Sequence, residues 1–226
     1  MPDAAVELVW SGRGLFVRGA DTRPHAVGTF PDRTFVAIRF RPGAAGDVLG
    51  LHGRDVADAR VGISELWGRP EMERLESLLA SATSARAAAD VLEDAVTARV
   101  RQPPDAVVRA LATTLEQERQ TRVGTLAKRM GVSERQLLRR CVDALGFGPK
   151  MLDRIIRFQR FRRLASERSR GLVELALLAG YFDQAHLARD CLRLAGETPT
   201  AHRARLTPER PIRPRRDGDD VIWSVG

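Results

Sequence analysis

Hydrophobic and polar residues alternate over short runs in the first third of the chain, between residues 4 and 67. The clearest runs are residues 6–10, 15–17 and 34–40, which are separated by turn-forming residues. Alternation with a period of two is typical of β-strands that bury one face. Half of the chain's twelve aromatic residues also lie here, which suits a small hydrophobic core. The pattern predicts a β-rich region over residues 1–70.

After this region the hydrophobic residues recur at spacings of three and four, as expected of amphipathic helices. The first stripe runs from Met72 to Leu79 and the second from Ala85 to Val100. Two adjacent prolines then interrupt the chain, and a third stripe follows from Asp105. We expect residues 71–103 to form a helical linker, whose helices either pair with a second subunit or cover the β-sheet.

A longer pattern occurs twice, fifty residues apart, in the second half of the chain. In its second copy, Asp183 is suited to cap a helix start and Gly196 to end the helix. Between them, Leu187 and Cys191 lie four residues apart on one helix face. Pro199 follows, and we expect it to prevent the helix from restarting. The matching residues of the first copy are Ser133, Leu137, Cys141, Gly146 and Pro149.

Each copy follows a short hydrophobic helix and a glycine-containing turn, at residues 122–130 and 172–179. Two short helices joined in this way form a helix-turn-helix, whose second helix, the recognition helix, enters the major groove of DNA. One such segment is weak support, because short helical hairpins are common in protein cores. Repetition with the same cap, core and stop positions is hard to obtain by accident. The sequence therefore predicts two helix-turn-helix units.

Residues 150–165 join the two units and are expected to form one long helix with broad hydrophobic coverage. Sixteen helical residues span about 24 Å at ~1.5 Å each. With the bodies of both units added, the recognition helices would lie near one turn of DNA apart, roughly 34 Å. Of this helix's arginines, we expect a minority to touch phosphate and the rest to be solvated. These are Arg154, Arg157, Arg160, Arg162 and Arg163.

Three stretches resemble the DNA-binding domain of AraC/XylS-type transcription regulators, namely LAKRMGVSERQLLRR, GFGPKMLDRIIRFQRFRRL and ELALLAGYFDQAHLARDCLRLAGETPTAHR. The resemblance covers residues 104–206 and implies an all-α domain with two helix-turn-helix units joined by one long helix. The family usually has Phe four residues after each core Leu. Here those positions are Cys141 and Cys191, so we expect a slightly smaller core there.

The stretches PDAAVELVW, GLFVRGADT and FVAIRFRPGAAGDVLG resemble the sensor region of a group of AraC-type regulators. In that group the β region begins earlier, so we expect either a reduced sensor or a start later than that of the group. The fold class expected for the whole chain is α+β, with a β-rich, sensor-like region before the all-α DNA-binding domain. We expect residues 207–226 to form a flexible tail whose apolar end, Val221-Ile222-Trp223, can dock elsewhere.

Charge is segregated along the chain, although the formal total is only +8. Residues 1–118 contain 14 Arg and Lys against 17 Asp and Glu, a net charge of −3. Residues 119–216 contain 23 against 9, a net charge of +14. A basic half attached to a mildly acidic half is typical of a module that binds a polyanion, here double-stranded DNA. The alternative, a merely solvated arginine surface, does not account for the repeated motif.

Residues off the hydrophobic face of each recognition helix are the candidates for DNA contact. Arginine can bridge guanine O6 and N7, and glutamine can bridge adenine N6 and N7. Asp183 is expected to cap its helix and not to read bases. The candidate DNA-binding residues are Ser133, Glu134, Arg135, Gln136, Arg139 and Arg140 in the first unit, and Gln184, Ala185, His186, Arg189 and Arg193 in the second.

Enzyme motifs are absent from the sequence, which has no P-loop, HExxH, GxSxG, CxxC or dinucleotide fingerprint. We therefore expect no catalytic residues and no cofactor. No metal site is expected either, because His25 and His52 lack partners at ligand spacing. Both cysteines occupy core positions, and we expect buried thiols in a reducing compartment. Without a signal layout or a long apolar run, a cytoplasmic, nucleoid-associated protein with no membrane partner is expected.

These observations favour a sequence-specific DNA-binding transcription regulator that places two recognition helices in successive major grooves. The resemblance further implies RNA polymerase, a second copy of the chain and a small-molecule effector as partners, and an activator as the usual role. The alternative function is a nonspecific architectural DNA-binding protein, which shares the positive charge but does not need two matched recognition helices.

Overall fold

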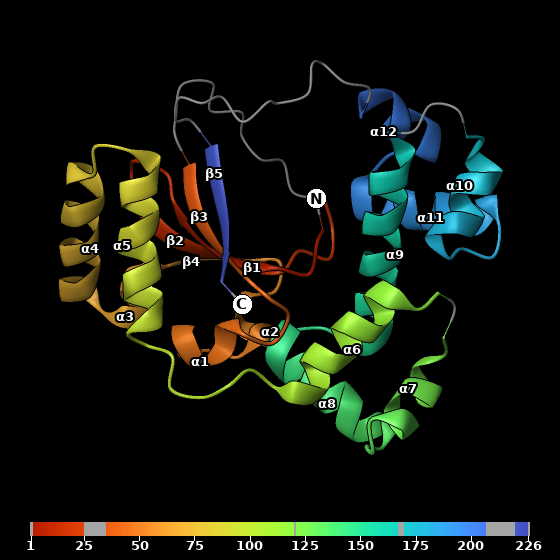
Figure 1. Cartoon of the computed structure of the whole chain (residues 1–226), viewed down its shortest axis with the longest axis horizontal. Helices are drawn as coiled ribbons and strands as arrows, with labels where there is room; N and C mark the ends of the chain where they lie inside the picture. The colour runs from red at the N-terminus through yellow and green to blue at the C-terminus, as the bar shows by residue number, and fades with distance from the viewer. Residues whose placement is uncertain (1, 25–34, 120, 167–169, 207–219, 226) are drawn as a thin grey trace.

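The computed structural model describes residues 2–24, 35–119, 121–166, 170–206 and 220–225 (Figure 1). His25 and residues 207–219 of the expected tail lie outside the described residues. The architecture is α+β, with a small sheet and its covering helices followed by an all-helical second half. This arrangement confirms the fold class expected from the sequence. Within the described residues, none of the helices combines the length and the hydrophobicity needed to cross a membrane.

The sheet has the strand order β4-β2-β1-β3-β5. Its strands are β1 (Val6–Trp10), β2 (Leu15–Arg18), β3 (Phe35–Phe40), β4 (Arg60–Gly62) and β5 (Asp220–Val225). Leu8 of β1 lies opposite Val17 on one neighbouring strand and Ile38 on the other, and all three side chains are fully buried. The hydrophobic alternation thus sets the strand register, because a slip of one residue would turn this face to solvent.

The end of the chain differs from the expected flexible tail. Residues 220–225 form β5, which pairs in parallel with β3 from Phe35↔Asp220 to Phe40↔Val225. The open backbone edge of β3 offers unpaired N–H and C=O groups, and the β-branched and aromatic composition of residues 221–223 suits a strand. The apolar end therefore docks on the sheet of the N-terminal region.

Among the residues that the structure describes, five helices accompany the sheet. They are α1 (Ala45–Leu49), α2 (Gly53–Val56), α3 (Ile63–Trp67), α4 (Arg69–Ser81) and α5 (Ala85–Thr97). The sequence predicted only turns at α1–α3, because helices of four or five residues are too short to show a helical period. The helix α5 packs on β3 and α4 packs on α5, so these helices cover the sheet (Figure 1). This is the second of the two arrangements considered for the linker helices.

The second half contains seven helices within the described residues. They are α6 (Ala106–Gln117), α7 (Val123–Arg129), α8 (Glu134–Leu145), α9 (Pro149–Ala165), α10 (Leu172–Ala179), α11 (Gln184–Ala195) and α12 (Pro199–Arg205). The long helix α9 runs between α7 and α8 at one end and α10 and α11 at the other (Figure 1). Figure 1 thus shows two helical hairpins connected by one helix, as the repeat predicts.

Pro199 does not stop the chain from becoming helical again, contrary to the expectation. It is the first residue of α12, and the Thr198 side chain caps that helix by accepting from Ala201 N at 3.2 Å. Proline suits this position because its missing N–H would have no helical partner there. His202 of α12 is fully buried, with its ring 5.4 Å from the ring of Phe158. Packing on α9 therefore stabilises the additional helix.

A buried arginine ties α6 and α10 to the connecting helix. Arg160 of α9 is only 7% exposed. Its guanidinium donates to Leu115 O at 2.8 Å and Glu116 O at 3.0 Å in the last turn of α6, and to Ala179 O at 3.0 Å at the end of α10. Carbonyls at helix C-termini lack helical partners and carry partial negative charge, so a cation satisfies them well. Arg160 is therefore a structural residue and not a phosphate contact.

The sheet region docks on the first recognition helix through two glycines that face each other. A Cβ atom at Gly53 of α2 would lie 2.4 Å from Leu145 N, and one at Gly146 would lie 2.4 Å from the Cβ of Ala57. Gly146 also ends α8 at φ 83°, a conformation that favours glycine. An ion pair of 2.7 Å between Arg54 and Asp143 borders this contact. The two backbones can approach this closely only because neither position has a side chain.

Replacing Arg160 with Met should lower the free energy of unfolding by roughly 2–4 kcal/mol, because three carbonyls lose their donor in a buried setting. Arg163→Met is the matched control, since Arg163 is an exposed arginine of the same helix and should change stability by about 0.5 kcal/mol or less. Urea unfolding followed by circular dichroism measures both values. Equal stability of the two variants would contradict the structural role of Arg160.

Gly53→Ala should destabilise the docked arrangement by roughly 1–3 kcal/mol, because the new methyl group overlaps the backbone of α8. Gly14→Ala provides the control, since a Cβ there meets only Glu76 Oε1, at an ordinary contact distance of 3.7 Å. Thermal unfolding of both variants compares the two costs. A Gly53→Ala protein as stable as the control would show that the two regions are not packed as described.

Candidate DNA-binding surface

The first recognition helix, α8, begins with a complete capping box. The Ser133 hydroxyl accepts from Gln136 N at 3.2 Å, and the Gln136 side-chain oxygen accepts from Ser133 N at 2.9 Å. Both side chains are exposed. With its oxygen held in this way, Gln136 cannot make the two-bond contact to adenine unless the capping box opens. The sequence predicted the cap at Ser133 but not the second half of the box.

The arginines of α8 divide into two kinds. Arg135 and Arg139 lie four residues apart and are exposed, and neither has an ion-pair partner among the described residues. Arg140 instead pairs with Asp105 at 2.7 Å, and Asp105 also caps α6. Glu134 completes the exposed candidates of the first turn. The side chains of α8 that remain available for base edges are therefore mainly Arg135 and Arg139.

The second recognition helix, α11, is capped by Asp183, whose carboxylate accepts from His186 N at 2.6 Å. The structure thus supports a capping role for this residue. Gln184, Ala185 and Arg193 are exposed. Arg189 is exposed as well, and its Nε donates to Ala185 O at 3.3 Å, which leaves the outer guanidinium nitrogens available.

His186 is less exposed than its neighbours on α11, with 28% of its side chain accessible. Its ring meets the Tyr181 ring edge-on, at 5.1 Å between centroids. Burial is the main cause that lowers the pKa of His186 below its usual value, and the nearby Arg157 guanidinium acts in the same direction. The imidazole is therefore neutral near pH 7, because its usual pKa of about 6.5 already lies below that pH.

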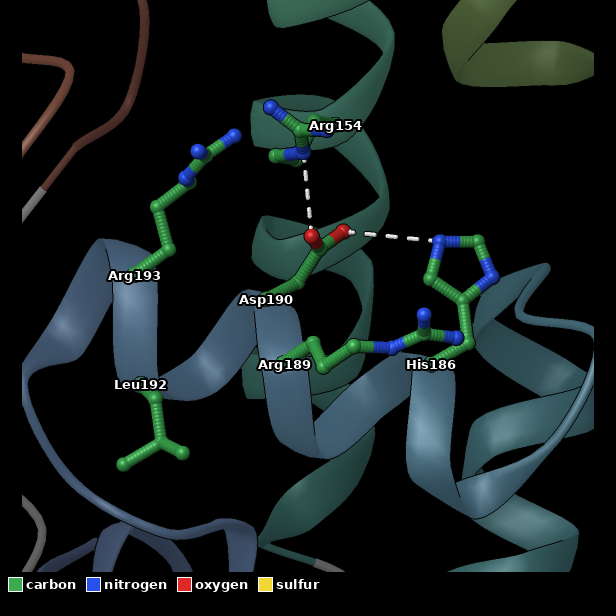
Figure 2. Close-up of a pocket in the computed structure, with 6 residues that line it drawn as sticks. All are labelled: Arg154, His186, Arg189, Asp190, Leu192 and Arg193. Carbon is green, nitrogen blue, oxygen red and sulfur yellow. Dashed lines mark ion pairs between the residues drawn. The ribbon is translucent and has the colours of Figure 1, made fainter.

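Asp190 is a residue of this surface that the sequence analysis did not identify. It is 4% exposed although it lies on a recognition helix, and its Oδ1 pairs with Arg154 Nε at 3.0 Å (Figure 2). It belongs to a hollow of about 490 Å³ beside α11, where basic side chains predominate. This hollow is lined by Arg154, His186, Arg189, Asp190, Leu192 and Arg193 (Figure 2). Asp190 follows the core residue Leu187 by three positions, which places it on the buried face of the helix. An acidic residue at such a position could have been recognised from the sequence as one that needs a partner.

Most arginines of the connecting helix have partners inside the protein. Arg154 pairs with Asp190, and Arg162 donates to the Gln159 side chain at 3.0 Å. Arg157 pairs with Asp153 at 3.3 Å, and its guanidinium lies 5.4 Å from the centre of the Tyr181 ring. Of the five candidates for phosphate contact, only Arg163 is exposed. The α9 helix therefore has fewer arginines available to DNA than its sequence suggests.

Both cysteines are buried free thiols, at corresponding positions of α8 and α11. Burial raises the pKa of Cys141 and of Cys191 to about 12. Thiolates, the reactive form, are therefore scarce in the folded protein near neutral pH. In the part of the chain that the structure describes, no cluster of His, Cys, Asp and Glu is suited to hold a metal ion.

Comparison with known proteins supports the class that this geometry indicates. A family model described as a helix-turn-helix domain matches residues 126–205. These residues therefore form a helix-turn-helix DNA-binding domain. This domain is of the AraC type, found in transcription regulators, which confirms over this segment the resemblance drawn from the sequence. The comparison with curated proteins found no match.

Several solved structures are also similar to this chain, and three of them are described here. The C-terminal domain of AraT, a response regulator from Geobacillus stearothermophilus, is 19% identical over 50% of this chain and 96% of that chain, with a TM-score of 0.44. A probable AraC family transcriptional regulator from Rhodopseudomonas palustris CGA009 is 24% identical over 46% of this chain and 100% of that chain, with a TM-score of 0.42. A transcriptional regulator with an AraC-type DNA-binding domain from Chromobacterium violaceum is 25% identical over 46% of this chain and 91% of that chain, with a TM-score of 0.40.

Thiol labelling tests the burial of the two cysteines. Folded protein should react with a thiol reagent only slowly near neutral pH, because both sulfur atoms are inaccessible and protonated. In denaturant both thiols should react fully, which provides the control for reagent and protein. Rapid modification of either cysteine in the folded protein would contradict its place in the core.

Proposed function

We propose that this protein is a sequence-specific transcription regulator, and that α8 and α11 enter successive major grooves of its DNA site. The observation that carries this proposal is the pair of matched, capped helices held by one connecting helix. The α9 helix has 17 residues and spans about 26 Å. With the width of the hairpins at its ends, this length is compatible with recognition helices one DNA turn apart, roughly 34 Å.

Base recognition is assigned to the exposed side chains in the N-terminal halves of the two helices. Arg135 and Arg139 on α8, and Arg189 on α11, have the guanidinium groups that pair best with guanine. Gln184 is suited to adenine, and the small Ala185 allows close approach or contact with a thymine methyl group. Arg140 is held by its ion pair with Asp105, so its main contribution is structural and its contribution to recognition is secondary.

The N-terminal region is proposed to modulate this activity. Its helix α2 packs on the C-terminal end of α8, so any change in the sheet region can be transmitted to the first recognition helix. A small-molecule effector, a second copy of the chain or RNA polymerase are the partners that such a regulator would use, and activation is the usual role in the family. Acting on chromosomal DNA, the protein would work in the cytoplasm, associated with the nucleoid.

The alternative is a nonspecific architectural DNA-binding protein. The net charge of +14 over residues 119–216 would attract DNA phosphates in this case as well. Charge attracts any DNA, whereas base-edge contacts distinguish one sequence from another. The two functions therefore differ in whether binding survives an excess of random competitor DNA.

Purified protein should bind DNA from around its own gene, or a site selected from random DNA, in the presence of excess competitor. Arg189→Ala and Arg135→Ala should each cost ~1–3 kcal/mol on that site, with much less effect on random DNA. Arg140→Ala is the matched control on α8, and it should affect the two DNAs alike because Asp105 already holds this side chain. Quantitative gel shifts measure each affinity.

Equal losses on the specific and the random DNA for the Arg135 and Arg189 variants would mean that these residues only touch phosphate. If selection from random DNA also yields no common sequence, the architectural function replaces the one proposed here.

A further inference from the structure

A single buried carboxylate lies behind the base-reading face of the second recognition helix. Asp190 is 4% exposed, and its two oxygens point to different partners (Figure 2). Oδ1 pairs with Arg154 of α9 at 3.0 Å, whereas Oδ2 points toward His186, one turn earlier on α11. Burying a carboxylate is costly unless its oxygens are satisfied. The stability of the buried Asp190 carboxylate therefore depends on Arg154 and His186.

The side of the imidazole that faces Asp190 is defined by the structure. His186 Nε2 lies 3.9 Å from Asp190 Oδ2, and this oxygen is buried without a hydrogen-bond partner among the described residues. A shift of about 1 Å brings the pair within hydrogen-bonding distance. A carboxylate accepts and cannot donate, so the only neutral form of His186 that satisfies Oδ2 has its proton on Nε2.

The charges around His186 favour this neutral form. Burial is the main cause of its lowered pKa, and Arg157 of α9 and Arg189 of α11 act in the same direction. Asp190 and Asp183 act in the opposite direction but do not reverse the shift. Tyr181 covers one edge of the ring, and Arg154 is already paired with Asp190. Asp153 of α9 also interacts with His186, and burial raises the pKa of this carboxyl group. A neutral imidazole with its proton on Nε2 leaves Nδ1 as a bare acceptor.

We propose that Asp190 is a positioning residue for DNA recognition, which holds the proton of His186 on Nε2 and thereby makes Nδ1 a hydrogen-bond acceptor toward a base. This inference rests on the function proposed above, in which α11 enters a major groove. Within that groove only adenine N6 and cytosine N4 are amino donors. His186 therefore selects adenine or cytosine at the base it meets, and disfavours guanine and thymine there.

Protonation of His186 changes this preference. Below its pKa, the imidazole has N–H groups at both nitrogens, so Nδ1 becomes a donor. Guanine, through N7 and O6, and thymine, through O4, are then accepted, adenine stays acceptable through N7, and cytosine, which offers only a donor, is disfavoured. Because the folded-state pKa is lowered from 6.5, the change occurs below that pH. The group of charges that faces the ring thus makes one position of the DNA site sensitive to acid.

Site selection from random DNA with wild-type protein, at about pH 7.5 and about pH 5, tests the proposal directly. The expected result is one position that requires adenine or cytosine at the higher pH and shifts by about three- to tenfold toward guanine or thymine at the lower pH. The same position should lose its preference in His186→Ala. A site with no position that requires adenine or cytosine at about pH 7.5 overturns the inference while leaving the proposed function in place.

Asp190→Asn tests the carboxylate without a change of pH. Arg154 should hold the amide oxygen, so the amide N–H faces His186 Nε2 and drives the proton to Nδ1. The base preference should then move from cytosine toward guanine or thymine at about pH 7.5, as it does for the wild type in acid. Glu174→Gln is the matched control, because it makes the same change on an exposed residue of α10 and should leave the preference unaltered.

The proton's position can be read independently of DNA and of the variant's folding. Nitrogen NMR of histidine-labelled wild-type protein distinguishes Nε2–H from Nδ1–H imidazole, and the His186 signal is identified by its loss in His186→Ala. Wild type should show Nε2–H near neutral pH, and a folded Asp190→Asn should show Nδ1–H. An Nδ1–H signal in the wild type overturns the inference. An empty site selection overturns the proposed function and this inference together.

Discussion

The buried guanidinium of Arg160 is the interaction on which the arrangement of the DNA-binding half depends. It lies on the connecting helix and donates to carbonyls at the ends of α6 and α10, which belong to different halves of the domain. A charge in a protein interior persists only where polar partners replace water, and helix C-termini provide such partners. This single side chain therefore joins the C-terminal ends of α6 and α10 to the connecting helix.

The contact between Gly53 and Gly146 plays a corresponding role between the sheet region and the DNA-binding half. It engages the C-terminal end of α8 and leaves the exposed arginines nearer its N-terminus free. The glycine that ends the recognition helix is thus also the surface against which the N-terminal region packs. Gly146 adopts the left-handed conformation that ends α8, and it also forms the close contact with Gly53. A change in the sheet region can therefore alter the position of α8.

Features that depend on neighbouring residues could be predicted from the sequence, and features that depend on distant ones could not. The caps at Ser133 and Asp183, the core cysteines and the two hairpins follow from local spacing and from the repeat. The burial of Arg160 and the role of Asp190 depend on which helices pack together. From the sequence, Arg160 was therefore expected to contact solvent or DNA, and Asp190 was not identified. The pairing of β5 with β3 joins residues almost 200 positions apart, and no local pattern indicates such a partner. Pro199 shows a different reason, because proline can end one helix and begin the next.

Guanine-methylation interference on a selected DNA site shows whether one chain reads two successive major grooves. We expect two groups of guanines whose N7 methylation blocks binding, on one face of the DNA and about 10 base pairs apart, with one chain bound per site. Arg189→Ala should remove only one of the two groups. A single group of interfering guanines, or two groups that require two bound chains, would contradict the account.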